Sequence, residues 1–553
     1  MNIADRLAES ARKYPHQRAV VKPAGRDWIG RYTYSHLTLE QLHHEANRLA
    51  DGMRKLGVGP GKKIVLMVPP GLEFIALTFA IFRTGAVVVL IDPGMGRTNI
   101  LNCLREVEPD GFAAIPLVHM IRRLKSRHFP KAIFNLVVGS ERFSGAYSYE
   151  SIRALGNEDY ATPQTSPRDP AAIIFTSGST GTPKGVLYEH GMFNAQVDLL
   201  RDHYQIQPGE IDLPGFPLFA LFNSAMGVTT VIPDMNPTKP AKVDPRKILR
   251  IAQDQGITQA FGSPAFWNRI GRYCQEKGIK IPTLKRALSA GAAVPLDVLR
   301  RMNEALPEAA SLHTPYGATE ALPICSIPHQ DILKRTQQQT SNGAGTCVGK
   351  PFPHVQVKII KITDGPIASI NEVRECHPSE IGEIIVQSPS VTREYYQKPD
   401  ATRLAKIQDG DSFWHRMGDV GYLSDGGNLW FCGRKAHIVK TTVGPMYSIC
   451  VESPFLEHSR VYRAALVGMG AEGRQKPIII IEPEAKQFPH SAKEQAAFAA
   501  ELRSLAREKE LTASIDTFLF HRSFPVDRRH NVKIHREELQ VWAEKELTRR
   551  VKT

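Results

Sequence analysis

The chain has 553 residues, of which 42% are hydrophobic and 23% are charged, close to the composition of an average soluble globular protein. This composition excludes collagen-like, disordered and low-complexity proteins, and the length predicts at least two domains. Lysine and arginine outnumber aspartate and glutamate by 70 to 56, which gives a formal net charge of +14. Because the basic residues are spread along the chain without a long run, this bulk charge gives little support for nucleic-acid binding.

Targeting and cross-linking signals are weak throughout the sequence. The seven cysteines are scattered without a CxxC pair, so neither a disulfide framework nor a zinc site is predicted. The N-terminus contains Asp5 and has no apolar core, unlike a signal peptide. The longest apolar stretch, residues 74–91, carries Arg83 and breaks at Gly85, so it falls short of a transmembrane span. We therefore expect a reduced, soluble, cytoplasmic protein with no transmembrane segment.

Amphipathic helices alternate with short apolar strands along the first half of the chain. A first helix is predicted at the N-terminus, with Ile3, Leu7 and Ala11 on its inner face. Pairs of a helix and a following strand are then predicted at residues 39–56 and 63–68, 73–82 and 87–91, 99–107 and 111–115, and 245–255 and 258–262, followed by a strand at 286–289 and a helix at 296–305. This alternation predicts parallel α/β sheets with helices on their faces.

The pattern changes to shorter, β-branched segments near residue 355. Strands predicted at residues 355–362, 381–387 and 421–431 indicate a smaller, largely antiparallel unit. We place a domain boundary after Gly433, because strands at 463–467 and 477–481 and a helix at 492–508 then suffice for a small separate domain. The predicted fold class is α/β: a large N-terminal domain (1–433) of layered α/β subdomains with a β-rich subdomain, and a small C-terminal α+β domain (434–553).

A glycine-rich loop follows an apolar strand at residues 171–175, with the sequence TSGSTGTPKG from Thr176 to Gly185. Glycine lets backbone N–H groups close around phosphate oxygens, the hydroxyls add donors, and Lys184 supplies positive charge. The loop is not a Walker A loop, since Pro183 and Gly185 flank the lysine where glycine and serine or threonine are required. A solvent-exposed linker would need neither the lysine nor the strand. The loop therefore predicts a phosphate-binding site.

This loop resembles the phosphate signature of the AMP-forming adenylating enzymes, which include acyl-CoA synthetases, luciferases and nonribosomal-peptide adenylation domains. Further motifs of that family follow in the same order: Ser289-Ala-Gly-Ala-Ala293, Tyr316-Gly-Ala-Thr-Glu320, Gly418-Asp419, Gly433-Arg434 and Lys533. Any one of these residues taken alone has an ordinary structural explanation, such as a helix cap or an ion pair. The ordered set, which spans nearly the whole chain, carries the resemblance.

The resemblance implies an enzyme that uses ATP and Mg²⁺ to adenylate a carboxylic acid, releasing pyrophosphate. It implies nucleotide contacts for Thr176, Ser177, Gly178, Ser179, Thr180, Gly181, Thr182, Lys184, Gly291, Ala292, Ala293, Tyr316, Gly317, Thr319, Asp419 and Arg434. Within this set, Thr319 would contact the α-phosphate and Asp419 would hold both ribose hydroxyls.

Four residues are expected to be catalytic: Lys533, Glu320, Thr319 and Lys184. A carboxylate is a poor nucleophile towards a polyanion, so its attack on the α-phosphate of ATP requires charge neutralisation. Mg²⁺ held by Glu320 and the loop of Lys184 would neutralise the phosphates. Lys533 would bridge the attacking carboxylate and the α-phosphate. The resemblance also implies that residues 434–553 form a mobile lid that carries Lys533.

Three positions depart from the family pattern. Ala220 stands where a PLFH-like motif usually has histidine, at the entrance of an acyl pocket that Phe219 and Phe222 are also expected to line. Ala436 stands at a hinge position that commonly holds aspartate or lysine, and Val532 replaces the usual glycine before the catalytic lysine. Since thiol-transferring members rotate the small domain about this hinge, these changes weaken the expectation of transfer to a thiol.

The departures match one subgroup. Segments 216–222, 231–237, 314–320, 343–349 and 528–533 together resemble the bacterial β-lactone synthetases of long-chain olefin biosynthesis. That resemblance implies adenylation of a 2-alkyl-3-hydroxy fatty acid, whose own hydroxyl then attacks the acyl carbonyl and expels AMP without CoA. The alternative is a long-chain fatty acyl-CoA ligase, or an acyl-AMP ligase that loads a carrier protein.

Alternatives of other classes stay open at this point. A non-catalytic adenylate-binding protein would not need the full set of motif residues, and a nucleic-acid binder would retain DNA with a steep salt dependence. We expect a small lipid substrate and no nucleic-acid partner, and we leave open an association with other enzymes of the same lipid pathway. No amphipathic membrane anchor stands out. His313 is a candidate base for the substrate hydroxyl, with a structural role as the alternative.

Overall fold

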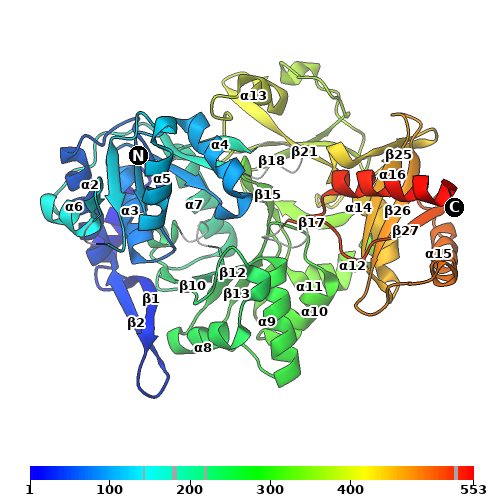
Figure 1. The fold of residues 1–553 in the computed structure, drawn as a ribbon, viewed down its shortest axis with the longest axis horizontal. Helices are drawn as coiled ribbons and strands as arrows, with labels where there is room; N and C mark the ends of the chain where they lie inside the picture. The colour runs from blue at the N-terminus through cyan, green and yellow to red at the C-terminus, as the bar shows by residue number, and fades with distance from the viewer. Residues whose placement is uncertain (141–142, 177–182, 217–220, 528–532, 553) are drawn as a thin grey trace.

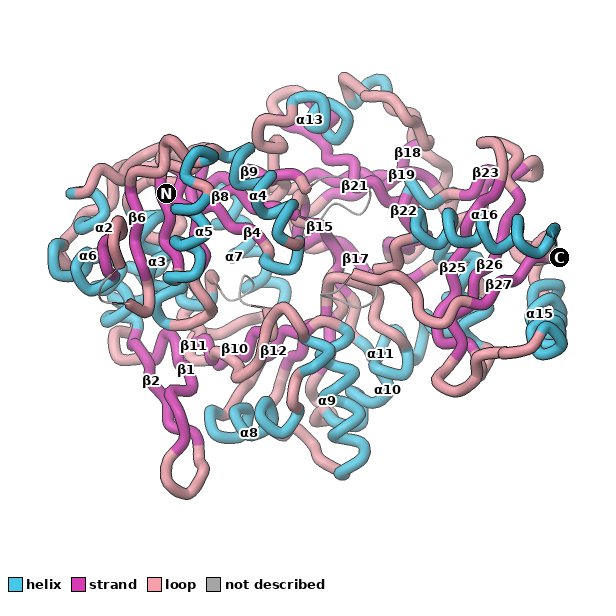
Figure 2. Tube along the Cα trace, viewed as in Figure 1, coloured by secondary structure: helices cyan, strands magenta, loops and turns pink. Residues whose placement is uncertain are grey.

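The computed structural model describes residues 1–140, 143–176, 183–216, 221–527 and 533–552. Three large sheets and two small ones form in this part of the chain, and the third large sheet lies between the first sheet and the C-terminal strands (Figures 1 and 2). The predicted α/β fold class is confirmed. At the N-terminus, helix α1 (Asp5–Lys13) buries Leu7 and Ala11 as its apolar spacing predicts.

The first sheet has the strand order β7-β6-β5-β3-β4-β8-β9 and is parallel except for the antiparallel pair of β8 and β9. Its strands are β3 (Lys63–Met67), β4 (Val87–Ile91), β5 (Gly111–Ala114), β6 (Phe134–Val137), β7 (Tyr147–Ser148), β8 (Pro170–Thr176) and β9 (Lys184–Glu189). One face packs against α2 (Leu39–Lys55), α3 (Leu72–Arg83), α6 (Tyr149–Leu155) and α7 (His190–Tyr204). The other face carries α4 (Arg97–Val107) and α5 (Pro116–Leu124).

The second sheet has the order β14-β13-β12-β10-β11-β1-β2. Its strands are β1 (Arg18–Arg26), β2 (Tyr32–Thr38), β10 (Ile211–Pro214), β11 (Thr229–Val231), β12 (Gln259–Gly262), β13 (Arg286–Ser289) and β14 (Ser311–His313). Only the β1–β2 pair is antiparallel among these strands of the described chain, and this hairpin projects from the molecule (Figure 1). Helices α8 (Pro245–Gln255), α9 (Pro264–Lys277) and α10 (Leu296–Ala305) share a core with the sheet.

The third sheet is antiparallel, as the shorter β-branched segments predicted, and has the order β15-β16-β17-β22-β21-β19-β18, with β20 on β21. Its strands are β15 (Tyr316–Ala318), β16 (Ala321–Ser326), β17 (Thr346–Pro351), β18 (Gln356–Ile360), β19 (Gly382–Gln387), β20 (Lys406–Asp409), β21 (Ser412–Leu423) and β22 (Leu429–Arg434). Short helices α11 (His329–Asp331), α12 (Gln337–Ser341) and α13 (Pro399–Ala405) connect them.

The single strand predicted at residues 421–431 is wrong. A turn interrupts it, because the Ser424 amide donates to the Asn428 carbonyl (3.0 Å) and Gly427 adopts a φ of +74°. Such a left-handed turn position favours glycine, and the pair Gly426-Gly427 supplies it. The chain therefore reverses between β21 and β22, and this reversal sets Asp419 opposite Arg434 in the ladder.

After Arg434 the chain forms a separate set of strands. These are the pair β23 (Val439–Thr441) and β24 (Gly444–Met446), and the sheet of β25 (Val461–Met469), β26 (Lys476–Pro483) and β27 (Thr517–Phe520). Helix α14 (Ser448–Glu452) precedes this sheet, and α15 (Ala492–Arg507) and α16 (Arg536–Lys552) pack with different cores of it. In the described residues no sheet combines strands from both sides of Arg434. The division into domains at 433/434 stays a prediction.

No helix in the described part of the chain combines the length and the apolar character that crossing a bilayer requires.

A buried ion pair fixes the strand that carries Asp419. On β21, Arg416 donates to Glu383 of β19 through Nε (3.0 Å) and Nη2 (2.7 Å). The two side chains are 4% and 2% exposed. Lys435, directly after β22, lies 3.1 Å from the same carboxylate. Glu383 therefore connects two strands of the third sheet to the first residues of the C-terminal unit.

We predict that Glu383→Gln strongly destabilises the third sheet. The substitution leaves the Arg416 guanidinium buried without its counter-charge, which costs about 3–5 kcal/mol in comparable pairs. Glu375→Gln is the matched control, because that carboxylate pairs with Lys358 at the surface of the same sheet, where such a pair contributes less than about 1 kcal/mol. Urea unfolding followed by tryptophan fluorescence measures both. An equally small loss of unfolding free energy in the two variants would show that the Arg416–Glu383 ion pair does not stabilise the sheet.

Candidate active site

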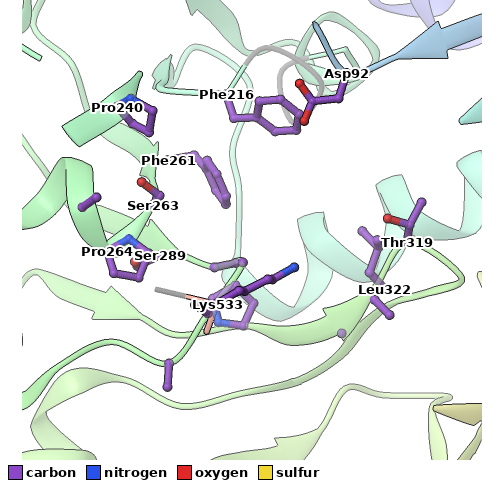
Figure 3. Close-up of a pocket in the computed structure, with 18 of the residues that line it drawn as sticks. Asp92, Phe216, Pro240, Phe261, Ser263, Pro264, Ser289, Thr319, Leu322 and Lys533 are labelled. Carbon is purple, nitrogen blue, oxygen red and sulfur yellow. The ribbon is translucent and has the colours of Figure 1, made fainter. Parts of the chain in front are cut away.

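One large cavity of about 2680 Å³ lies where the first, second and third sheets meet the C-terminal unit. Residues at the carboxyl ends of parallel strands line it: Asp92 follows β4, Ser263 follows β12 and Ser289 ends β13 (Figure 3). The carboxyl ends of the strands are the usual location of ligands in open α/β sheets. Lys533, from the far end of the sequence, extends its ammonium group into the same space (Figure 3).

The predicted phosphate loop connects β8 to β9. Thr176 and Lys184 are paired in the antiparallel ladder, so the two ends of the loop meet at the edge of the first sheet. The loop residues from Ser177 to Thr182 lie outside the described residues. Lys184 lines the cavity, and its Nζ lies 4.9 Å from the centre of the Tyr395 ring, a distance at which a cation is attracted to an aromatic face.

The turn between β15 and β16 presents Thr319 and Glu320 to the cavity. The backbone of this turn is held by neighbouring side chains: the Tyr188 hydroxyl donates to the carbonyl of Thr319. The amide and the hydroxyl of Thr392 both donate to the carbonyl of Glu320 (2.9 and 3.1 Å). A Cβ at Gly317, before this turn, would lie 2.8 Å from a carbonyl oxygen of β16, so the tight pairing of β15 and β16 requires glycine.

Tyr395 and Lys406 both interact with Glu320, Tyr395 through a hydrogen bond and Lys406 through its charge, and the sequence analysis missed both. The Tyr395 hydroxyl donates to Glu320 Oε1 (2.8 Å), and Tyr395 thereby lies between Glu320 and Lys184. Burial lowers the pKa of Lys406 to about 7, and the negative charge of Glu320 partly opposes this. Neither residue stands in a recognisable motif. Tyr395 lies in a loop, and Lys406 is the first residue of a short strand. Only their spatial position marks them.

Asp419 is the most constrained carboxylate of the site. It is 3% exposed, and its two oxygens have different partners. The Tyr316 hydroxyl donates to Oδ2 (2.7 Å), and Arg434 Nη1 lies 2.9 Å from Oδ1. The ladder register of β21 and β22 sets Asp419 opposite Arg434, so the ion pair follows from strand pairing. The motif residues that the sequence analysis selected at positions 316, 419 and 434 therefore meet in one cluster.

The pKa of Asp419 reflects opposing effects. Burial raises its pKa above the usual range of an aspartate, since a charged carboxylate is costly away from water. The positive charge of Arg434 lowers it, and so does the hydrogen bond from Tyr316. Lys533 also lowers the pKa of Asp419 through its charge. The C-terminal unit thus already acts electrostatically on the site.

The segment that carries Lys533 is anchored on both sides. The Lys533 amide donates to Asp527 Oδ1 and the Asp527 amide donates to the Lys533 carbonyl, each at 3.0 Å. Three residues further on, Arg536 donates to both oxygens of the buried Glu452 on α14 (2.7 and 2.9 Å). Residues 528–532, with the predicted departure Val532, lie outside the described residues. Ala436 is exposed in a short 3₁₀ turn, Lys435–His437, and also lines the cavity.

The predicted adenine turn follows β13 and lines the cavity with Gly291, Ala292 and Ala293. Gly291 has a φ of +95°, a backbone conformation that residues with a Cβ atom adopt only with strain. The Ser289 side chain is 1% exposed, and its Oγ has no hydrogen-bond partner within the described part of the chain. A buried hydroxyl that faces a cavity is available to a ligand, because such groups are costly when left unsatisfied.

The predicted acyl pocket is described only in part. Phe219 and Ala220 lie outside the described residues, and Phe222 packs with its ring 4.8 Å from that of Phe193 rather than against the cavity. Apolar side chains nevertheless line the cavity in two groups: Leu200, Tyr204, Ile206, Phe216, Met226 and Phe261 around the second sheet, and Ile100, Leu101, Leu104, Leu117, Ile121 and Phe129 around α4 and α5.

His313, the candidate base, packs its ring 5.1 Å from that of Tyr204 and is not among the described residues that line the cavity. Burial lowers its pKa to about 4, so the imidazole is neutral at pH 7. This geometry favours the structural role.

We predict that Tyr316→Phe weakens AMP binding roughly tenfold or more, because a hydrogen bond to a charged group contributes about 1.5–3 kcal/mol. The substitution keeps the ring and removes only the donor to Asp419. It also removes an interaction that lowers the pKa of Asp419, so that pKa rises. A carboxyl group with a higher pKa takes up its proton at a higher pH. The loss of AMP binding on acidification therefore moves to higher pH in the variant.

Isothermal titration calorimetry over a pH series measures both effects. Tyr34→Phe is the control, since the Tyr34 hydroxyl donates to Asp254 (2.9 Å) next to the β1–β2 hairpin, outside the cavity lining. This variant should bind AMP as the wild type does. Unchanged affinity and an unchanged pH profile in Tyr316→Phe would show that the hydroxyl does not support the carboxylate in binding.

Comparison with known proteins agrees with this geometry. The model of the AMP-binding enzyme family matches residues 7–396. The olefin β-lactone synthetase of Xanthomonas campestris pv. campestris is 43% identical over 549 residues, 98% of this chain and 97% of the relative. The olefin β-lactone synthetase of Stenotrophomonas maltophilia is 42% identical over 557 residues, 99% of each chain.

Among solved structures, the amide bond synthetase McbA from Marinactinospora thermotolerans has the same fold. The TM-score is 0.77 at 22% identity, over 98% of this chain and 99% of that one. The match at the level of the fold thus extends beyond the matched family region to the C-terminal unit. The motifs, the cavity and the sequence matches lead to one assignment: the chain belongs to the AMP-binding enzyme family.

Proposed function

We propose that this protein adenylates a 2-alkyl-3-hydroxy long-chain acid with ATP and then closes the acyl-adenylate to a β-lactone. The observation that carries the adenylation is the convergence of Lys533, Asp419 and Glu320 on one cavity from distant parts of the chain. Support for the second step comes from the 43% and 42% identity to two olefin β-lactone synthetases over nearly the whole chain.

In the first step, a carboxylate oxygen of the acid attacks the α-phosphorus and the bond to pyrophosphate breaks. Asp419 retains lone pairs for the ribose hydroxyls, because Tyr316 and Arg434 each occupy only part of its two oxygens. Lys533 would neutralise the charge that develops between the carboxylate and the α-phosphate. Lys184 would neutralise the departing phosphates from the edge of the first sheet.

Glu320 fits the role of a Mg²⁺ ligand. Its carboxylate supplies the hard oxygen that Mg²⁺ prefers, and Oε1 is oriented by the Tyr395 hydroxyl (2.8 Å). Within the described residues no three His, Cys, Asp or Glu side chains are placed to hold a metal together. This agrees with a cation held by one carboxylate and the substrate phosphates, which is the common arrangement for Mg²⁺ with nucleotides. Bound there, Mg²⁺ would act as a Lewis acid on the phosphate oxygens.

In the second step, the 3-hydroxyl oxygen of the same molecule attacks the acyl carbonyl carbon, and the bond to AMP breaks. The hydroxyl proton leaves to a base or to water. Since the nucleophile and the carbonyl belong to one substrate molecule, their effective molarity reaches about 10⁵ M or more when they are well oriented. This offsets part of the strain of the four-membered ring. No thiol acceptor is needed, in line with the exposed alanine at the hinge position 436.

The cavity has room for two alkyl chains. Its volume of about 2680 Å³ exceeds the 300–1,000 Å³ typical of small-molecule pockets, although it also includes the nucleotide site. The two apolar groups of lining residues, around the second sheet and around α4 and α5, offer separate walls for the two chains. A location in the cytoplasm and an association with enzymes of the same lipid pathway stay predictions.

Mass spectrometry of the purified protein with MgATP and a long-chain 2-alkyl-3-hydroxy acid, without CoA, tests the proposed product. We expect the substrate minus one water, together with one AMP per product. A matched acid without the 3-hydroxyl should stop at the acyl-adenylate, since it lacks the internal nucleophile. If product forms from the hydroxy acid only after CoA or a carrier protein is added, the protein is a ligase and the lactone step is overturned.

Lys533→Ala should slow adenylate formation by roughly 100-fold or more, the usual effect of removing a preorganised group that stabilises transition-state charge. The affinity for ATP should change little, because the residues that hold the ribose and the phosphates remain. Pyrophosphate exchange measures the rate. Lys545→Ala on α16 is the control, since Lys545 is outside the cavity lining and should leave the rate unchanged. An unaltered exchange rate in Lys533→Ala would refute the catalytic assignment.

A further inference from the structure

Helix α5 presents an apolar stripe to solvent. Leu117, Met120, Ile121 and Leu124 stand at positions i, i+3, i+4 and i+7, which place four side chains on one face of a helix. They are 61%, 54%, 46% and 82% exposed. Surface helices of globular proteins normally turn such a stripe towards the core. Here the usual orientation is reversed, although the sequence analysis identified no amphipathic anchor.

The opposite face of α5 holds the helix on the first sheet. His119 is fully buried, and its Nε2 lies 2.8 Å from the carbonyl oxygen of Leu136 on β6. Val118 packs against the same core as the buried residues of α4. The helix is therefore fixed to the sheet by His119 and Val118, and exposure of the stripe is a property of the fold.

The stripe lies within a segment of uniform charge. Residues 111–140 contain no aspartate or glutamate and five basic residues: Arg122, Arg123, Lys125, Arg127 and Lys131. Lys131 is paired with Glu108 (2.7 Å), whereas Arg123, Lys125 and Arg127 are exposed beside or just after the end of α5. An apolar face bordered by cations, without acids, is the composition of a helix that lies on an anionic membrane surface.

The stripe also borders the site. Leu117, Ile121 and Leu124 line the same cavity as Lys533, together with Ile100, Leu101 and Leu104 of α4 on the same face of the first sheet (Figure 1). The wall of one cavity thus extends from the surface of α5 to the reacting groups. A lipid that leaves a bilayer at this surface would first meet the apolar side chains of α5 and α4.

We infer that α5 docks on the surface of an anionic lipid bilayer, so that the cavity faces the bilayer. The stripe would enter the boundary of headgroups and acyl chains, and the cations would contact lipid phosphates. The composition favours a bilayer over a protein partner, because an apolar helix face flanked by the exposed cations Arg123, Lys125 and Arg127 is typical of helices that lie on anionic lipid surfaces. The docking stands on α5 alone; that the cargo is the acid to be adenylated rests on the proposed function.

Vesicle sedimentation of the full-length protein, without ATP or acid, tests the docking. The vesicles are phosphatidylcholine alone, or phosphatidylcholine and phosphatidylglycerol in equal parts. We expect binding to the anionic vesicles at low salt and its loss at high salt. The double variant Met120→Glu/Arg127→Gln should reduce the partition coefficient by roughly tenfold or more, since each cation near such a surface contributes about fivefold. Neither residue lines the cavity, so the nucleotide site is preserved.

Trp28→Ser is the matched control, because Trp28 is 93% exposed in the β1–β2 hairpin, a different projecting apolar side chain. It should bind vesicles as the wild type does. The docking proposal is overturned if the wild type ignores anionic vesicles, if the double variant binds equally well, or if only Trp28→Ser loses binding. It is also overturned if sedimentation velocity shows that the double variant disrupts an oligomer, which would make α5 a face between copies of this chain.

A second measurement separates this inference from the proposed function. Turnover of the hydroxy acid is compared in anionic vesicles and in detergent micelles. Docking predicts that the double variant loses turnover in vesicles and retains it in micelles. Absence of turnover in both media for the wild type, with intact vesicle binding, would refute the proposed function and leave the docking in place. Equal turnover of variant and wild type in vesicles would show that docking does not deliver the substrate.

Discussion

The buried carboxylate of Asp419 is the constraint on which the site depends. A charged carboxylate that is removed from water is costly unless opposite charge and hydrogen-bond donors surround it. Tyr316 and Arg434 supply these from β15 and from the last residue of β22 (2.7 and 2.9 Å). The ion pair with Asp419 therefore holds Arg434, the residue at which the third sheet ends and after which the C-terminal unit begins.

The C-terminal unit brings its own charge into this arrangement. The positive charge of Lys533 lowers the pKa of Asp419, so the two groups interact electrostatically although they are far apart in sequence. Two buried carboxylates contribute: Glu383 of the third sheet contacts Lys435 at the start of the unit (3.1 Å), and within the unit Glu452 contacts Arg536 near Lys533 (2.7 Å). Ion pairs of this kind position charges in a low-dielectric cavity, where each has a larger effect than in water.

The same cavity combines this charged end with apolar walls, and its wall continues to the exposed face of α5. A nucleotide and a carboxylate need cations and donors, whereas alkyl chains need surface from which water is excluded. One cavity that provides both suits a reaction in which the head of a lipid is activated while its chains stay apolar. The basic character of residues 111–140 gives part of the net charge of +14 a specific location.

Local sequence determined the alternation of helices and strands and the α/β class, because periodicity and turn chemistry act over a few neighbouring residues. The motif residues came from the resemblance of the sequence to the adenylating enzymes. It did not reveal Tyr395 or Lys406 beside Glu320, which only the packing of a loop and a short strand brings there. Nor did it reveal which way α5 faces. The apolar spacing of a helix is the same whether its stripe is buried or exposed, and only the tertiary structure, through the buried contact of His119, decided that it meets solvent.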